Sequence, residues 1–209
     1  MMQNNYDNIA KYYDTASRLV FGKAQVNAQI NQLQYIGNSN SILVVGGGTG
    51  WVLEEIAKIK SSGLNIVYVE LSTKMIELAK VRNYGLNNVS FINTRIEDFD
   101  QDISFDIILT PFLFDNFLLE KCESVFRKLD THLKKDGLWF LVDFTVASKK
   151  GNWWKKVFLK VMYRFFKIIS QVEAKALINM NPFFIKANYQ IVNERFYYQQ
   201  FIQAIIYRK

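Results

Sequence analysis

A glycine-rich run is the first feature of this sequence whose residue types and spacing could do chemistry. The run is Gly46-Gly47-Gly48-Thr49-Gly50, and it joins an apolar segment at 42–45 to a helix-like segment that begins at Trp51. Glycine lets the backbone approach a ligand closely where any Cβ atom would collide, and the following helix points its first amide groups at that ligand. We therefore expect this loop to bind a cofactor.

A carboxylate follows the glycine run at the spacing found in nucleotide-binding units. Glu70 ends the apolar segment 65–70, about twenty residues after Gly50. A carboxylate at this place in a nucleotide-binding unit accepts hydrogen bonds from two ribose hydroxyls. Together, the loop and Glu70 predict a cofactor that contains adenosine.

The spacing of the glycines bears on which cofactor that is. NAD sites use G-x-G-x-x-G, whereas Gly46, Gly48 and Gly50 stand at every second position. No lysine follows the run as in a phosphate-binding P-loop. The pattern favours S-adenosylmethionine, with an NAD-dependent oxidoreductase as the alternative.

Other common chemistries have little to work with. The chain has one cysteine, Cys122, and one histidine, His132, so it can form no internal disulfide and no Cys/His zinc site. His132 precedes a turn, near the expected end of a helix, where a partial positive charge is stabilised. We predict no metal and give His132 a structural role.

Alternating apolar and amphipathic segments must position the loop and Glu70. Strand-like runs occupy 41–45, 65–70, 89–93, 105–110 and 137–144, and the predicted helices between them are Trp51–Lys60, Thr73–Asn83 and Asn116–Leu133. Ser72 is a suitable N-cap for the second helix. Such alternation predicts an α/β fold with a doubly wound, Rossmann-like sheet and helices on both faces.

The ends of the chain complete this prediction. Residues 7–36 suggest one or two helices, and the strand-like runs 190–197 and 200–208 are close enough to form a hairpin. We expect one domain over 1–209 with a seven-stranded mixed sheet whose last strand is antiparallel. Its parts are an N-terminal helical cap (1–38), a cofactor-binding core (39–146), a basic aromatic helical segment (147–182) and C-terminal strands (183–209).

Four motifs in order resemble one known family. ILVVGGGTG, YVELSTKMIELAK, FDIILTPFLFDNF and LKKDGLWFLVDF resemble the successive motifs of class I S-adenosylmethionine-dependent methyltransferases. The opening YDNIAKYYD resembles the N-terminal helix of the branch that contains the ubiquinone/menaquinone-biosynthesis methyltransferases. The resemblance covers nearly the whole chain.

The resemblance implies roles for particular residues. The glycine loop, with Gly46, Gly47, Gly48 and Gly50, would lie against the methionine and ribose parts of the cofactor, and Glu70 would bind the ribose hydroxyls. The other residues that the resemblance places around the cofactor are Leu71, Met75, Arg95, Ile96 and Glu97 near the adenine and Thr110 near the methyl donor.

Two positions depart from the family pattern. Val44 replaces an acidic residue that helps to hold the methionine amino group, and Arg95 replaces an aspartate that accepts from the adenine amine. Each change removes a polar contact of about 1–3 kcal/mol. A non-catalytic protein that binds an adenosyl ligand is therefore a second alternative.

Methyl transfer requires alignment more than it requires a particular catalytic group. The resemblance implies no universal catalytic residue, and the candidates near the acceptor are Asp115, Asp143 and Tyr13, with Tyr12 and Asp14 beside the last. As alternatives, Asp115 could cap a helix that begins at Asn116, and Asp143 could pair with a basic neighbour. The apolar stretch 110–114 favours a small apolar acceptor, quinone- or lipid-like.

The net charge of +7 is concentrated in one segment. Residues 149–167 hold seven cationic and no acidic residues, and a helix there would be amphipathic. Over 149–172 it could lie on an anionic membrane surface or simply pack on the sheet with its lysines in water. RNA binding is disfavoured because no groove or separate module is evident. With no signal peptide pattern, we expect a cytoplasmic protein that binds no nucleic acid, as a monomer or homodimer.

Overall fold

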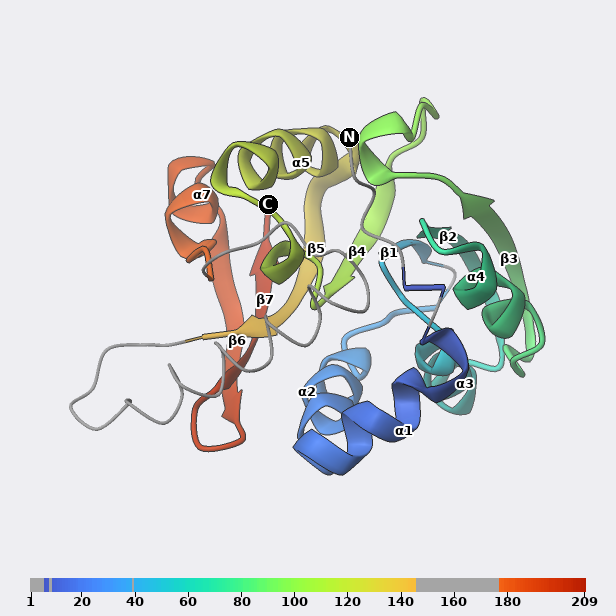
Figure 1. The fold of residues 1–209 in the computed structure, drawn as a ribbon. Helices are drawn as coiled ribbons and strands as arrows, with labels where there is room; N and C mark the ends of the chain where they lie inside the picture. Colours follow the sequence, from blue (N-terminus) through green and yellow to red (C-terminus); the bar gives the residue numbers. More distant parts are fainter. Residues whose placement is uncertain (1–5, 8, 39, 146–176) are drawn as a thin grey trace.

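A seven-stranded mixed sheet forms the centre of the protein (Figure 1). The computed structural model describes residues 6–7, 9–38, 40–145 and 177–209. The sheet order is β3-β2-β1-β4-β5-β7-β6, with β1 to β5 parallel and β7 antiparallel to both of its neighbours. The predicted fold class is confirmed. The strands are β1 Ser41–Val45, β2 Ser62–Glu70, β3 Leu86–Asn93, β4 Phe105–Pro111, β5 Leu133–Phe144, β6 Gln190–Tyr197 and β7 Ile202–Arg208.

Helices cover both faces of this sheet (Figure 1). α5 and α7 pack on one face, and α2, α3 and α4 pack on the other, while α1 continues from α2 toward α4. The described helices are α1 Ala10–Phe21, α2 Ala24–Leu33, α3 Trp51–Ile59, α4 Thr73–Lys80, α5 Leu119–His132 and α7 Asn181–Lys186, with short 3-10 helices η1 Ile96–Asp98 and η2 Phe114–Asn116.

β5 shows how one strand serves both cores. Trp139 and Leu141 point to the α5–α7 face, and Phe140 between them points to the α2–α3 face. The Trp139 ring stacks on Phe126 of α5 at a centroid distance of 5.2 Å. Because helices cover both faces of the sheet, successive residues of a central strand are apolar whichever face they point to. This explains the unbroken apolar runs in the sequence.

Local chemistry sets where two helices begin. The Ser72 hydroxyl accepts from the Met75 amide at 3.1 Å, so the predicted N-cap of α4 is confirmed. α5 begins at Leu119 and not at Asn116 as predicted. The Asn116 carboxamide donates to the Phe112 carbonyl at 2.8 Å, and this contact closes the separate turn η2 first.

The end of the chain forms the predicted hairpin. β6 pairs with β7 through a turn in which Tyr198, Gln199 and Gln200 all have positive φ. The predicted basic aromatic helix lies mostly outside the described residues, since 146–176 are not among them, and residues 177–180 are not helical. Within the described part of the chain, no helix is both long and apolar enough to cross a membrane.

Candidate active site

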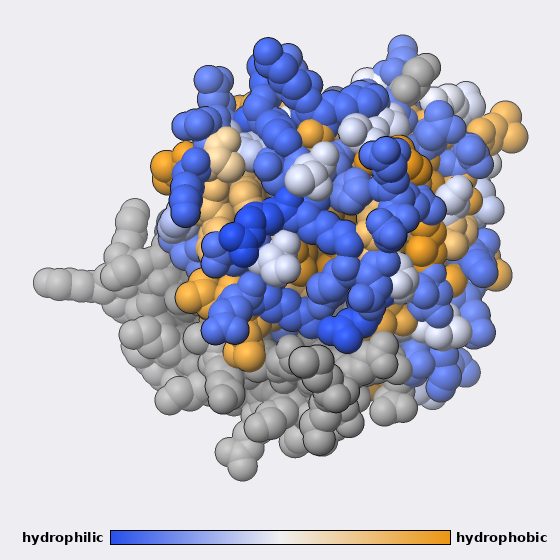
Figure 2. All heavy atoms as spheres, turned by 90° about the horizontal axis from the view of Figure 1, so that it is seen from above, coloured by the Kyte–Doolittle hydropathy of each residue, from blue (hydrophilic) through white to orange (hydrophobic). Residues whose placement is uncertain are grey.

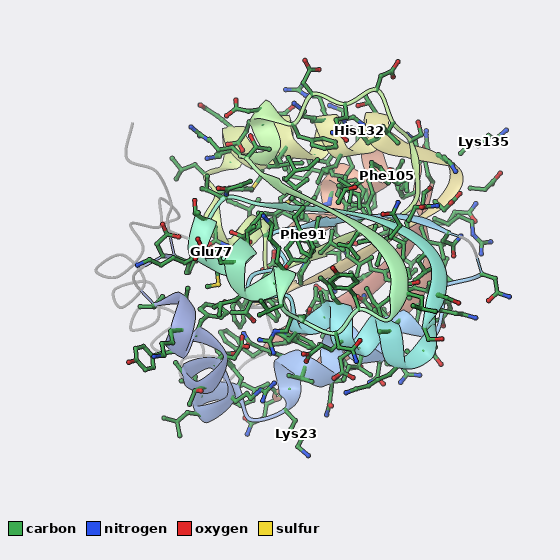
Figure 3. The ribbon with its side chains drawn as sticks, turned by 90° about the vertical axis from the view of Figure 1, so that its right-hand side faces the viewer. Lys23, Glu77, Phe91, Phe105, His132 and Lys135 are labelled. Carbon is green, nitrogen blue, oxygen red and sulfur yellow. The ribbon has the colours of Figure 1, made fainter. Side chains whose placement is uncertain are left out.

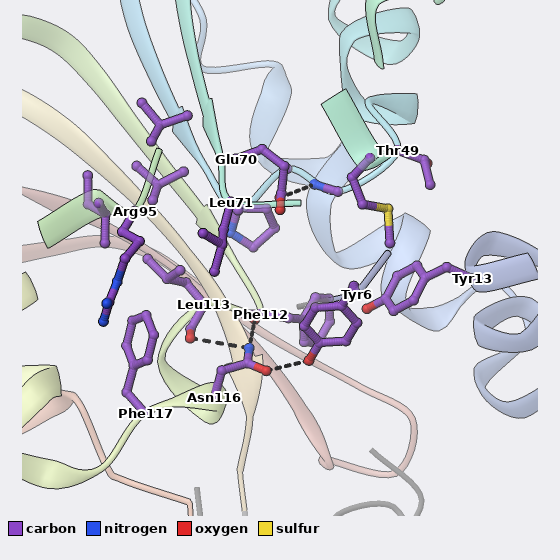
Figure 4. Close-up of a pocket in the computed structure, with 18 of the residues that line it drawn as sticks. Tyr6, Tyr13, Thr49, Glu70, Leu71, Arg95, Phe112, Leu113, Asn116 and Phe117 are labelled. Atoms are coloured by element: carbon purple, nitrogen blue, oxygen red, sulfur yellow. Dashed lines mark hydrogen bonds between the residues drawn. The ribbon is translucent and has the colours of Figure 1, made fainter. Parts of the chain in front are cut away.

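A cavity lies at the carboxyl ends of β1, β2 and β4 (Figure 4). β1 stands between β2 and β4, so the direction in which the chain adds strands reverses at this point. Open α/β sheets bind their ligands at such a switch point. The sheet topology therefore brings the glycine loop and the end of β2, separate in sequence, to one wall.

Glycines 46 to 48 form the floor of the cavity. Gly46 and Gly48 have φ of +67° and +63°, which only glycine adopts without strain. A Cβ atom on Gly48 would meet nothing within 4 Å, so the space that a side chain would fill is open to a ligand. The Tyr68 hydroxyl donates to the Gly48 carbonyl at 2.9 Å and fixes the loop from below.

Glu70 is a buried acceptor in the adjoining wall. Its side chain is 8% exposed, and its two oxygens accept from the backbone amides of Ser72 at 2.9 Å and Gly48 at 3.1 Å. Burial raises the pKa of this carboxyl, and the two amides oppose the rise. A carboxylate has about four acceptor sites, so two remain for hydroxyl donors from a ligand.

Charged residues gather at the far end of the cavity. Glu97 binds Lys121 at 2.8 Å and Arg95 at 3.3 Å, and the Lys121 ammonium lies 4.8 Å from the centre of the Phe117 ring. Burial alone raises the pKa of Glu97, but the hydrogen bond from Lys121, a backbone hydrogen bond and the charges of Lys121 and Arg95 together outweigh it, and the pKa is lowered. The apolar side chains of Leu71 and Ile96 line the cavity beside these charges.

The N-terminal segment closes the cavity from the other side. Tyr13 and Asp14 of α1 line it, and the Asp14 carboxylate accepts from the Thr49 hydroxyl at 2.8 Å and pairs with Arg82 at 2.9 Å. Farther along, Asp7 accepts from the Lys74 amide at the start of α4 at 3.1 Å. The predicted cap thus contacts the glycine loop directly.

Two acidic residues lie behind the cavity wall and not in it. Asp115 accepts from the Asn116 carboxamide at 2.7 Å, and Asp143 accepts from the Phe144 amide at 2.8 Å, with further amide bonds from Phe114 and Asp115. The helix-cap alternative for Asp115 is wrong, whereas the alternative that Asp143 pairs with a basic neighbour stays a prediction. Asp115 lies inside η2 and does not cap α5, and among the described residues Asp143 is held by backbone amides.

Burial raises the pKa of Asp143 from 3.8 to about 7. Burial and then the charge of Asp143 raise the pKa of Asp115 as well. A group whose pKa is raised by folding binds its proton more tightly in the folded state, so the stability it contributes at low pH is lost as the pH rises through about 7. The ionised pair therefore opposes folding at alkaline pH.

Substitution of Asp143 by asparagine tests this coupling. Asparagine resembles the protonated acid, whereas the wild type loses stability as the pH rises from 3.8, the ordinary pKa, to about 7, the pKa in the folded state. We therefore expect the melting temperature of Asp143→Asn to exceed that of the wild type by clearly more at pH 8 than at pH 5. Melting curves of both proteins across this range measure the difference. A difference that does not change with pH would contradict the raised pKa.

The cavity brings most of the predicted site residues together. Those in its wall are Gly46, Gly47, Gly48, Glu70, Leu71, Met75, Arg95, Ile96, Glu97 and Tyr13. Besides Asp115 and Asp143, three predicted residues lie outside the wall. Thr110 is fully buried and accepts from the Trp139 indole at 2.9 Å, Gly50 packs against Ala79, and Tyr12 is 67% exposed on the outer side of α1.

Some wall residues were not predicted. Tyr6 donates to the Asn116 side chain, which joins the N-terminal segment to η2 (Figure 4). Lys121 reaches the cavity from α5. The repeated Tyr-Asp pair of YDNIAKYYD was a signal for Tyr6, but no local pattern distinguishes Lys121 from other helix-surface lysines.

His132 is not among the residues that line the cavity. It is the last residue of α5, its Nδ1 lies 2.8 Å from the Ile103 carbonyl, and its ring lies near Phe105 (Figure 3). Within the described part of the chain, no group of three His, Cys, Asp or Glu side chains is placed to hold a metal.

Comparison with known proteins agrees with this geometry. Residues 42–137 match the family described as "Methyltransferase domain". The ubiquinone/menaquinone biosynthesis C-methyltransferase of Geotalea uraniireducens (strain Rf4) is 26% identical over 172 residues, which cover 79% of this chain and 69% of that protein.

Solved structures share the fold. The 1,6-didemethyltoxoflavin-N1-methyltransferase of Burkholderia thailandensis, solved with S-adenosylhomocysteine, has a TM-score of 0.66 at 14% identity over 96% of this chain and 84% of its own. A Haloferax volcanii methyltransferase, solved with the Trm112 activator, has a TM-score of 0.72 at 11% identity over 100% and 99% of the two chains.

The matched core, the sheet order and the glycine loop define the class of the protein. Residues 42–137 match a methyltransferase domain, and these findings together support a class I S-adenosylmethionine-dependent methyltransferase with S-adenosylmethionine as its methyl donor. Both alternatives, an NAD-dependent oxidoreductase and a non-catalytic binding protein, give way to this assignment.

Proposed function

We propose that this enzyme methylates a small apolar acceptor, quinone- or lipid-like, in the half of the cavity that faces Phe112. The walls there come from Pro111 at the end of β4, from Phe112 and Leu113 after it, and from the rings of Tyr6 and Tyr13 (Figure 4). This apolar, aromatic lining is the observation that carries the proposal, since burial of apolar surface favours an apolar ligand. The Geotalea relative, named as a C-methyltransferase of ubiquinone and menaquinone biosynthesis, supports it.

The cofactor fits the other half of the same cavity. Glu70 would accept from both ribose hydroxyls, Gly46 to Gly48 would lie against the methionine part, and Leu71, Met75 and Ile96 would enclose the adenine. When bound, S-adenosylmethionine supplies an activated methyl group on a sulfonium. Arg95 and Lys121 line this end of the cavity and would bring donors to the adenine edge.

Asp14 compensates for one departure from the family pattern. Val44 is fully buried in the core and offers no carboxylate to the methionine amino group. Asp14 lies in the cavity wall, and its carboxylate accepts from the hydroxyl of Thr49 in the glycine loop. We propose that it holds the amino group in place of the missing acid, at the end of the cavity where a cation is stabilised.

The acceptor is held chiefly by positioning. Burial and then the charge of Asp115 raise the pKa of Tyr13, so its hydroxyl keeps its proton and is available to donate a hydrogen bond to the acceptor. Asp115 and Asp143 lie behind the wall, where Asp115 orients Asn116 and through it Tyr6. Both acids are therefore positioning residues in this proposal. Holding nucleophile and methyl group in line supplies most of what such a displacement needs.

An acceptor screen tests the proposal. We would measure S-adenosylhomocysteine formation with a naphthohydroquinone, a simple phenol, a polar amine and a short RNA. We expect turnover with the hydroquinone and the weakest turnover with the RNA. Phe112→Asp should lower kcat/KM for the apolar acceptor while cofactor affinity stays unchanged. Turnover that is confined to RNA or to the polar amine would overturn the proposal.

A further inference from the structure

The outer face of α1 carries apolar residues where a surface helix normally carries polar ones. The inner face holds the buried residues Ala10 and Phe21, which anchor the helix to the protein. On the opposite side Tyr12, Ala16 and Leu19 follow each other at helical spacing, and Tyr12 is 67% and Leu19 is 87% exposed. α1 thus has two apolar faces, one of them in water.

Not every face of the molecule looks like this. The surface over α5, seen from above in Figure 2, is mainly hydrophilic, with apolar residues scattered between charged ones. Scattered apolar residues need no explanation, but a stripe along one helix does.

Cations flank this stripe. Lys11 and Arg18 are exposed one position before Tyr12 and Leu19, and Lys23 follows the helix, also exposed. The single acid of α1, Asp14, is turned inward and pairs with Arg82. The exposed side of α1 therefore combines apolar and basic residues with no acid, the composition of helices that lie in the headgroup region of a membrane.

We propose that α1 docks this enzyme on an anionic lipid surface, with Tyr12, Ala16 and Leu19 entering the acyl boundary and Lys11, Arg18 and Lys23 meeting the headgroups. Charge favours this partner over a second copy of the chain. A two-fold interface would bring the same three cations together from both sides, whereas an anionic bilayer neutralises them. This inference goes beyond the proposed function, and its test does not depend on the acceptor.

The position of α1 gives the docking a consequence. Its inner side carries Tyr13 and Asp14 in the cavity wall, and its outer side would touch lipid. One helix would then separate the cavity from the membrane, so its displacement would open a path for an apolar acceptor from the bilayer.

Vesicle flotation of the full-length protein tests the proposal. The vesicles are phosphatidylcholine alone or an equal mixture of phosphatidylcholine and phosphatidylglycerol. The test variant is Leu19→Glu and its matched control is Leu86→Glu, because both leucines are 87% exposed and Leu86 lies at the start of β3. Both variants keep residues 149–167, so any lipid binding by those cations is the same in the two proteins.

We expect the wild-type protein and Leu86→Glu to bind the anionic vesicles. Leu19→Glu should bind about tenfold or more weakly, since a charge replaces a leucine that enters the acyl boundary of the membrane. Affinity for S-adenosylhomocysteine and melting temperature should be the same in all three, which separates docking from the proposed function. Equal binding by both variants, no binding by the wild type, or a wild-type dimer that Leu19→Glu dissociates would each overturn the proposal.

Discussion

Replacement of Glu70 by alanine should lower the affinity for S-adenosylmethionine and S-adenosylhomocysteine at least about 100-fold. Hydrogen bonds to a charged acceptor contribute about 1.5–3 kcal/mol each, and the carboxylate has two free acceptor sites at the cavity wall. Losing two such bonds costs about 3 kcal/mol or more, which is about 100-fold in affinity. Isothermal titration of the purified variant measures the loss.

Two further variants control this result. Glu77→Ala removes a carboxylate of the same kind from the outer side of α4 (Figure 3), where it is exposed, and should bind like the wild type. Glu70→Gln keeps one acceptor oxygen and should fall between the two. Melting temperatures show whether each variant folds, because Glu70 also binds the amides of Ser72 and Gly48. Unchanged binding by a folded Glu70→Ala would refute the role of Glu70.

Alanine at two glycines of the same loop should have different main effects, on stability at Gly50 and on cofactor binding at Gly48. A Cβ atom at Gly50 would lie 2.6 Å from the Ala79 Cα atom, at a φ of +77°. Left-handed backbone costs alanine about 1–2 kcal/mol and overpacking about 1–3 kcal/mol, so Gly50→Ala should lower the melting temperature by roughly 10 °C. Thermal unfolding measures this.

Gly48→Ala should instead spoil binding. Its φ is also positive, but its Cβ atom would meet nothing within 4 Å. We expect only the backbone cost, a fall of roughly 4 °C, together with a loss of cofactor affinity because the added methyl group stands in the ligand space. If Gly50→Ala melted like Gly48→Ala, the close packing of the loop against α4 would be contradicted.

The sequence predicted the parts of the site that depend on one local pattern. The glycine loop follows β1, Glu70 is the last residue of β2, and residues 95–97 come just after β3. Parallel strands deliver their carboxyl ends to one edge of the sheet. The position of these residues needs only the strand order. This is why nearly all of the predicted cofactor residues line one cavity.

Residues that depend on rotation about a strand or on distant packing were harder to place. β4 was predicted to end at Thr110, but it continues through Pro111, and the Thr110 side chain faces the Trp139 core and not the cavity. Gly50 was predicted beside the ligand, yet its role is contact with α4. Asp14 binds Thr49 and Arg82, and no spacing in the sequence indicates that these three residues meet.

The central claim is that this cavity binds the adenosyl cofactor of a methyltransferase, and direct titration tests it best. We would titrate the wild-type protein with S-adenosylmethionine, S-adenosylhomocysteine and NAD in the same buffer. The structure predicts micromolar binding of the first two and none of NAD. Absence of binding by both adenosyl ligands, or a preference for NAD, would contradict the account.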